Sequence, residues 1–324
     1  MNILFQNKLT KFNNYQRPTL LFHPHVETIY PAIFRSVALK PYQRERITTP
    51  DDDFLDLDWI KQGSNKLVII SHGLEGNTER AYIKGMAKIF HDQQYDVLAW
   101  NYRGCSEEMN KQRRFYHSGA TDDLDVVVQH ALAQAYEEIT LIGFSLGGNL
   151  TLKYLGEHKR DERIRKSVVF SVPMDLHSSC IQLGKSSNRL YAKRFLKTLK
   201  QKVRDKAALR NDLDISRIDQ VTDLQSFDDQ FTSVLHGYRD AVDYYTQCSS
   251  IRFAEYIQIP TLIVNALNDP FLSETCFPVQ KLQHHPFVQL EVTTEGGHVG
   301  FAQFNKKNVF WSEERALHFV KHHD

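Results

Sequence analysis

The sequence predicts a doubly wound α/β fold built on a mostly parallel sheet. Short apolar runs rich in β-branched residues alternate along the chain with segments whose apolar residues recur every three or four positions. Such alternation is typical of parallel strands joined by amphipathic helices. In addition, a Gly-x-Ser-x-Gly motif at residues 143–147 follows one apolar run directly and leads into a helical pattern. In that strand–turn–helix context a serine can project above the edge of a sheet.

The expected elements follow one another in a regular order. We expect strands at residues 56–59, 66–71, 95–100, 139–144, 167–171, 261–266 and 288–292, and helices at 82–90, 124–135, 146–155 and 313–321. Most of these strands are continuous apolar runs, as in a buried parallel sheet. Polar and apolar residues alternate at 56–59, so we expect that strand to be half exposed.

One block interrupts the alternation. Residues 174–259 read as helices without a convincing strand. A helical insertion between two strands, at the end of a sheet where active sites form, predicts a cap, or lid. The core is then formed by residues 46–173 and 260–324, and we expect residues 1–45 to pack on it as a helical or extended segment.

The central helix of the predicted cap has an apolar side and a basic remainder. The apolar side consists of Tyr191, Phe195, Leu199 and Val203, and the remainder is mostly Lys193, Arg194, Lys197, Lys200, Lys202 and Arg204. A basic helix face is commonly just solvated. The alternative is attraction to an anionic lipid surface, giving peripheral membrane contact, or to an acidic substrate. The sequence leaves both interpretations open.

Composition limits the classes of protein to consider. The 324 residues are 41% hydrophobic and 24% charged, with a formal net charge of +1, which describes an ordinary globular protein without a global nucleic-acid footprint. Four scattered cysteines without a CxxC pair fit reduced thiols better than disulfides or a zinc site. No signal peptide and no run of about 20 apolar residues is apparent. We therefore expect a cytoplasmic protein, with a monomer favoured.

Two partners for the serine follow it in the chain. A serine hydroxyl becomes a useful nucleophile when a histidine accepts its proton and a carboxylate orients that histidine. Asp269 lies in a turn after the strand at 261–266, and His298 lies in a glycine-rich loop after the last strand. The order Ser145, Asp269, His298 is the one expected for this kind of elbow. We predict these three as the catalytic residues.

An oxyanion hole requires two backbone N–H donors. One is expected at Leu146, the first residue of the helix after Ser145. The other is expected at Leu74, in the loop that begins with His72 and Gly73, because this fold builds the hole there. Gly73 permits the unusual backbone path that such a loop needs.

Several strings together resemble a known family. They are His-Gly-Leu-Glu-Gly at 72–76, Asn-Tyr-Arg-Gly-Cys-Ser at 101–106, Tyr-His-Ser-Gly at 116–119, Gly-Phe-Ser-Leu-Gly-Gly-Asn at 143–149, Leu-Lys-Tyr-Leu-Gly at 152–156 and Gly-Gly-His-Val-Gly-Phe at 296–301. From about residue 24 to the C-terminus, the chain resembles the YheT-type esterase family of the α/β-hydrolase superfamily, which is related to eukaryotic abhydrolase-domain lipases and esterases. The resemblance implies an α/β-hydrolase fold, with the helical cap before the acid-bearing strand. It also implies a Ser145–Asp269–His298 triad and carboxylic-ester hydrolysis.

Other interpretations were weighed against this one. His117 and Asp122 fit a short His-x4-Asp acyltransferase pattern that chance often supplies. We expect Arg103 and His117 instead to brace loops beneath the active site. His23 and His25 lack the further ligands of a metal site, and neither a Walker loop nor a GxGxxG motif occurs, so no metal or cofactor is expected.

A small-molecule ester or lipid-like substrate, rather than nucleic acid, is the expected partner. A thioesterase or acyltransferase using the same residues remains open. So does a non-catalytic binding protein that retains the fold.

Overall fold

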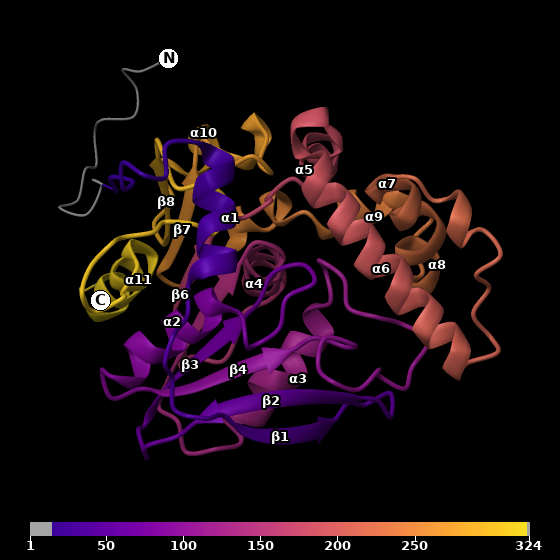
Figure 1. The fold of residues 1–324 in the computed structure, drawn as a ribbon. Coiled ribbons are helices and arrows are strands. Elements are labelled where there is room, and N and C mark those ends of the chain that lie inside the picture. Colours follow the sequence, from indigo (N-terminus) through magenta and orange to yellow (C-terminus); the bar gives the residue numbers. More distant parts are fainter. Residues whose placement is uncertain (1–14, 323–324) are drawn as a thin grey trace.

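An eight-stranded sheet runs through the molecule in the order β1-β2-β4-β3-β5-β6-β7-β8 (Figure 1). The computed structural model describes residues 15–322. The strands are β1 (Gln43–Thr48), β2 (Phe54–Ile60), β3 (Lys66–Ser71), β4 (Asp96–Asn101), β5 (Glu138–Phe144), β6 (Ile164–Phe170), β7 (Thr261–Ala266) and β8 (Val288–Thr293). From β4 to β8 all neighbours pair in parallel, whereas β1–β2 and β2–β4 are antiparallel. The predicted doubly wound α/β fold is confirmed.

Helices cover both faces of the sheet. On one face α3 (Thr121–Leu132), α4 (Leu146–Glu157) and α10 (Val279–Leu282) bury their apolar sides. On the other face lie α2 (Ala81–His91) and α11 (Trp311–His322). The carboxyl ends of β3, β5, β6, β7 and β8 lie at one edge, where α/β sheets bind their ligands. The turns after these strands hold the candidate site residues.

The early strand at residues 56–59 is not half exposed, contrary to the expectation from its alternation. Every residue of β2 is buried, because β1, which the sequence analysis missed, covers that edge. Arg46 of β1 donates to Asp56 at 2.7 Å, and Arg44 forms an ion pair with Asp58. Ion pairing lets the carboxylates be buried at positions that an alternating pattern assigns to solvent.

Residues between β6 and β7 contribute helices to the described structure and no strand. These helices are α5 (Leu176–Gly184), α6 (Arg189–Leu209), α7 (Leu224–Phe227), α8 (Ser233–His236) and α9 (Ala241–Cys248), with a π-helical turn at Asp228–Thr232. We refer to residues 174–259 as the helical insertion. In Figure 1 the long helix α6 extends obliquely across it. Within residues 15–322, no helix combines the length and apolar content that crossing a bilayer requires.

The N-terminal part of the chain adds α1 (Pro24–Phe34), which precedes the sheet in sequence. Arg35, directly after this helix, forms a buried ion pair with Glu313 of α11 at 2.6 Å. At the other end, His25 hydrogen-bonds the hydroxyl of Tyr191 in α6 at 3.1 Å. The α1 helix therefore contacts both the core and the helical insertion.

Candidate active site

Ser145 lies in a tight turn between β5 and α4. Its backbone is strained, with φ 54° and ψ −118°, in a region that non-glycine residues rarely adopt. The turn is possible because glycines flank it closely. A Cβ at Gly143 would lie 2.4 Å from the carbonyl oxygen of Gly147, and a Cβ at Gly147 would lie 2.4 Å from that of Ser71. Only glycine at these positions lets α4 approach β5 and the end of β3 to this distance.

Ser145, His298 and Asp269 form one hydrogen-bonded chain. The Oγ of Ser145 lies 2.9 Å from Nε2 of His298, and Nδ1 of the same ring lies 2.8 Å from Oδ2 of Asp269. With a proton on Nδ1 the ring donates to the Asp269 carboxylate, and Nε2 is then free to accept the hydrogen bond of the Ser145 hydroxyl. The Asp269 side chain is fully buried, and its Oδ1 also accepts the Phe271 N–H at 2.8 Å.

Residues of α1 that sequence analysis missed hold the histidine loop in place. The Glu27 carboxylate is 1% exposed and accepts from the Gly296 N–H and from the Asn268 side-chain amide, both at 2.7 Å. Thr28 accepts the N–H of His298 at 2.9 Å. Burial raises the pKa of Glu27 above its ordinary value. One helix turn thus joins the loop of the histidine to the loop of the aspartate.

Two backbone N–H groups beside Ser145 are available as donors. In the part of the chain that the structure describes, neither Leu74 nor Leu146 donates its N–H to a protein acceptor. Leu146 is the first residue of α4, where amides lack helical partners. Leu74 follows Gly73, and a Cβ on Gly73 would lie 3.3 Å from that of Ser145. The two predicted donors therefore belong to segments that adjoin the serine.

His72 and Arg103, two of the predicted supporting residues, are both buried. His72 lies beside Tyr102, whereas Arg103 lies between Asp53 and Asp123. His72 accepts the N–H of Tyr102, and the two rings pack at a tilt of 39° with centroids 3.9 Å apart. Burial lowers the pKa of His72 to about 3. The guanidinium of Arg103 joins Asp123 of α3 to the turn before β2, through Asp53 at 2.7 Å. Arg103 thus braces loops around β4, and its polar contacts do not reach Ser145.

His117 contacts the helical insertion. Its ring lies 4.4 Å from that of His236 and near those of Tyr238 and Tyr244, and burial lowers its pKa well below the ordinary value. Asp122, the other half of the weighed His-x4-Asp pattern, instead pairs with Arg114 at 2.6 Å. His117 therefore belongs to the contact between the core and the insertion.

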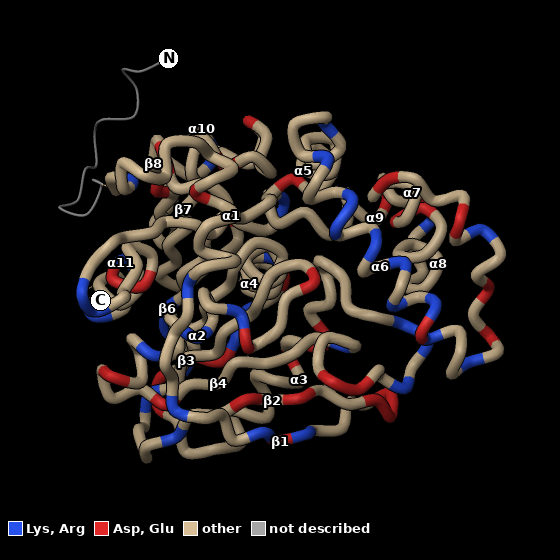
Figure 2. Tube along the Cα trace, in the orientation of Figure 1, with Lys and Arg blue, Asp and Glu red and all other residues tan. Residues whose placement is uncertain are grey.

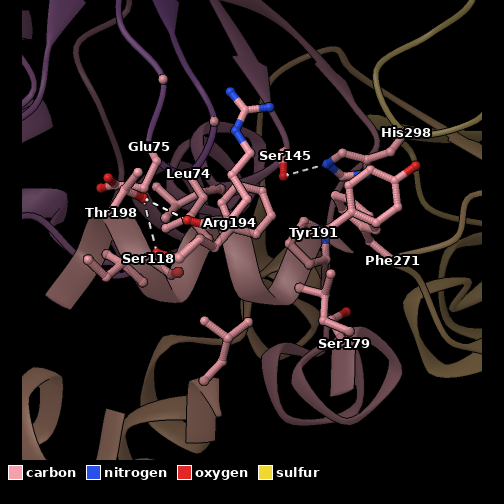
Figure 3. Close-up of a pocket in the computed structure, with 18 of the residues that line it drawn as sticks. Leu74, Glu75, Ser118, Ser145, Ser179, Tyr191, Arg194, Thr198, Phe271 and His298 are labelled. Atoms are coloured by element: carbon pink, nitrogen blue, oxygen red, sulfur yellow. Dashed lines mark hydrogen bonds between the residues drawn. The ribbon is translucent and has the colours of Figure 1, made fainter. Parts of the chain in front are cut away.

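A cavity of about 360 Å³ opens in front of Ser145. Figure 3 shows Ser145 joined to His298, with Leu74, Tyr191 and Phe271 around them. Apolar residues of the insertion form much of the lining, including the predicted apolar side of α6: Tyr191, Phe195, Leu199 and Val203. The ring of Phe271 lies 4.1 Å from that of His298 and 4.8 Å from that of Tyr191. The insertion thus packs, through one aromatic ring, against the histidine.

A second contact joins the insertion to the loop after β3. Lys202 of α6 donates to Glu75 at 2.8 Å and to the thiol of Cys105 at 3.1 Å. The hydroxyl of Tyr116 donates to the same carboxylate at 2.7 Å and accepts the N–H of Glu75. Glu75 has a positive φ of 53°, next to the candidate donor Leu74. Charged and polar contacts therefore fix this loop from both sides.

His23 and His25, the two histidines considered above as a metal pair, instead contact each other and the helical insertion. The rings of His23 and His25 stack at 5.1 Å, and His25 bonds to Tyr191. Among the described residues, no group of three or more His, Cys, Asp or Glu side chains is arranged to hold a metal ion.

Comparison with known proteins establishes the family of the chain. The model of the family described as alpha/beta hydrolase fold matches residues 66–304, and the chain belongs to this family. Within it, the chain is 32% identical to the YheT protein of Escherichia coli (strain K12) over 286 residues, which cover 86% of this chain and 84% of that protein. The predicted resemblance to YheT-type esterases is confirmed.

Two further proteins show how far the similarity extends. Phospholipase ABHD3 of Bos taurus is 29% identical over 290 residues, covering 86% of this chain and 70% of that protein. The solved structure of the Pyrococcus furiosus esterase Pf2001 matches with a TM-score of 0.59, covering 89% of this chain and 95% of that chain. Its sequence is 20% identical, so this likeness speaks for the fold alone.

Proposed function

We propose that the protein is a serine hydrolase that cleaves carboxylic esters through an acyl-enzyme on Ser145. The observation that carries the proposal is the continuous hydrogen-bonded chain from Ser145 through His298 to Asp269. The relatives support hydrolysis of esters as the reaction class, since the names of the two sequence relatives contain the words esterase and phospholipase.

The reaction follows from the positions of these groups. His298 accepts the hydroxyl proton through Nε2 as Ser145 Oγ attacks the ester carbonyl carbon. Asp269 keeps the other ring proton on Nδ1 and stabilises the imidazolium that forms. His298 then gives its proton to the leaving alcohol oxygen as the carbon–oxygen bond breaks. Water, deprotonated by the same ring, releases the acid from Ser145 and restores the hydroxyl.

The negative charge on the tetrahedral oxygen requires donors that are already in place. We assign this role to the N–H groups of Leu74 and Leu146, which have no other acceptor in the described structure. Preorganised donors of this kind lower the barrier by about 3 kcal/mol each in serine hydrolases.

The cavity supports an ester with an apolar acyl or alcohol part as the substrate. Its lining from the helical insertion is mostly aliphatic and aromatic, and burial of apolar groups stabilises the complex by about 25 cal/mol per Å². We propose residues 174–259 as a cap on the core of residues 46–173 and 260–324. A thioester of the same shape uses the same residues and is included in the test below.

Labelling with a fluorophosphonate probe tests the proposal. Wild-type protein should be labelled and Ser145→Ala should not, while both give the same circular dichroism spectrum. His298→Ala should lower the hydrolysis of p-nitrophenyl esters by several orders of magnitude. A panel of p-nitrophenyl esters and thioesters of increasing chain length then ranks the substrates. A folded wild type that is neither labelled nor active would leave only a binding protein with this fold.

A further inference from the structure

The basic residues of α6 divide into two groups with different surroundings. In the C-terminal half, every one has an acceptor within the protein: Lys200 donates to the Val221 carbonyl, Lys202 to Glu75, Arg204 to Asp219 and Lys206 to the Gln112 carbonyl. In the N-terminal half, Arg189, Lys193, Arg194 and Lys197 are exposed. Their side chains have no ion pair or hydrogen bond with any described residue.

The four unpaired cations lie on one side of the helix. Positions 189, 193 and 197 are spaced by four residues, and Arg194 lies three positions before Lys197, so the four side chains are neighbours on the helix surface and form one continuous stripe. Figure 2 shows the basic positions along α6 and the acidic positions gathered around α7 and the segment that leads to it. The acidic residues near Arg204 and Arg210 pair with those side chains. The N-terminal half of α6 therefore presents uncompensated positive charge.

This stripe borders the mouth of the cavity. A residue that both lines the cavity and is exposed to solvent marks its opening. On α6 these residues are Arg194 and Thr198, and on α1 they are Ala32 and Ile33. The cavity thus opens between α1 and α6, with Lys193 and Lys197 beside the opening.

Large apolar side chains project into solvent around the same opening. Leu190 is 77% exposed and lies three, four and seven positions before Lys193, Arg194 and Lys197, so it shares their side of the helix. On α1, Ile33 is 64% exposed and the adjacent Phe34 is 68% exposed. If the basic face of α6 were only solvated by water, there would be no reason for large apolar side chains to be exposed beside it.

We infer that this surface, defined by Leu190, the four unpaired cations of α6, and Ile33 and Phe34 of α1, docks on an anionic lipid surface. Cations attract the negative headgroups, and apolar side chains insert at the boundary of the acyl region. The apolar component favours a lipid surface over nucleic acid, which binds mainly through its phosphates. Docking in this orientation turns the mouth of the cavity toward the membrane.

Vesicle binding tests this inference separately from catalysis. Wild type and Ser145→Ala should both sediment with phosphatidylcholine vesicles containing 30% phosphatidylglycerol, and much less with pure phosphatidylcholine. The triple variant Arg189→Gln, Lys193→Gln, Lys197→Gln keeps Arg194, which lines the cavity. It should bind the anionic vesicles at least tenfold more weakly, with unchanged hydrolysis of a short, water-soluble ester.

A matched variant controls for total charge. Lys159→Gln, Arg165→Gln and Lys321→Gln remove three exposed cations near the start of β6, at the opposite edge of the sheet, and should leave vesicle binding as in wild type. At 0.5 M salt the attraction between charges is screened, so the remaining vesicle binding depends on the apolar side chains. The double variant Leu190→Ser, Phe34→Ser should abolish this remaining binding. Equal binding by the two triple variants, no preference of wild type for anionic vesicles, or tighter binding to duplex DNA than to vesicles would each overturn the inference.

Discussion

Glu27 offers a sharp test of how the site is held together. Its carboxylate accepts from the Gly296 N–H and from the Asn268 amide, so it joins the histidine loop to the aspartate loop. In Glu27→Gln, the amide has one acceptor oxygen for these two donors. Asn268 is unable to compensate by turning its amide over, because its own oxygen accepts the Gly297 N–H at 3.0 Å. One buried donor is therefore left unpaired.

The cost can be worked out from these contacts. An unpaired buried donor costs about 1–3 kcal/mol, so Glu27→Gln should lower the free energy of unfolding by about 2 kcal/mol. Glu27→Ala leaves two donors unpaired and should cost about twice as much. A displacement of about 1 Å in a positioned catalytic group lowers the rate by about 100-fold. We therefore expect kcat to fall about 10- to 100-fold in Glu27→Gln, with a smaller change in KM.

Urea unfolding and hydrolysis of p-nitrophenyl butyrate measure the two effects. The rate of fluorophosphonate labelling reports on the serine and histidine independently of substrate binding. Glu314→Gln, an exposed position on α11, is the matched control and should leave all three measurements unchanged. If Glu27→Gln remains as stable and as fast as wild type, the carboxylate does not position the histidine loop.

Three other perturbations follow from the same structure. Lys202→Met leaves the Glu75 carboxylate without its cation, and kcat should fall about tenfold. Adding Glu75→Gln removes the unpaired charge and should restore part of the lost activity. A double-mutant cycle on kcat measures this coupling. Burial raises the pKa of Asp228 to about 6. The folded state thus holds a proton that the unfolded state releases near pH 4, and the free energy of unfolding should fall by about 2 kcal/mol between pH 4 and 6.5. Chemical denaturation at each pH should show a decrease that is larger by this amount in wild type than in Asp228→Asn, since the other buried carboxyls titrate alike in both. Gly143→Ala places a Cβ against the Gly147 carbonyl and should yield no soluble folded protein. The control Gly184→Ala, at an open position, should yield soluble folded protein under the same expression conditions.

Much of the architecture was predictable because it is encoded locally. The parallel strands are continuous apolar runs bounded by turns, and the strand at 261–266 was predicted with the bounds of β7. The turn at Ser145 carries a local signal in the Gly-x-Ser-x-Gly motif: Gly143 is required by the approach of β5 to α4, and Gly147 by the approach of α4 to the end of β3. His298 and Asp269 follow β8 and β7 at the same edge of the sheet, so their order in the chain, together with the turn after β7 and the glycine-rich loop after β8, predicted that they lie near Ser145.

What sequence reasoning missed depends on contacts between distant segments. The Gln43–Thr48 strand is mostly polar, and its partners Asp56 and Asp58 are buried with ion pairs to Arg44 and Arg46 of β1 and hydrogen bonds from Thr78, Asn101 and Ser106. Glu27 looks like any exposed glutamate in sequence, yet it bonds residues more than 240 positions away. An isolated charge gives no periodic signal, so its buried partners are visible only in three dimensions.

The two contacts that join the helical insertion to the core suggest why the site needs it. Tyr191 reaches His298 through Phe271, while Lys202 holds Glu75 beside the Leu74 donor. One helix, α6, thus connects to His298 through Phe271 and directly to Glu75, on the two sides of Ser145 to which the proposed base and the proposed oxyanion donor belong. Since the free cations of the same helix border the mouth of the cavity, a surface that binds them is linked to both sides through a single rigid element.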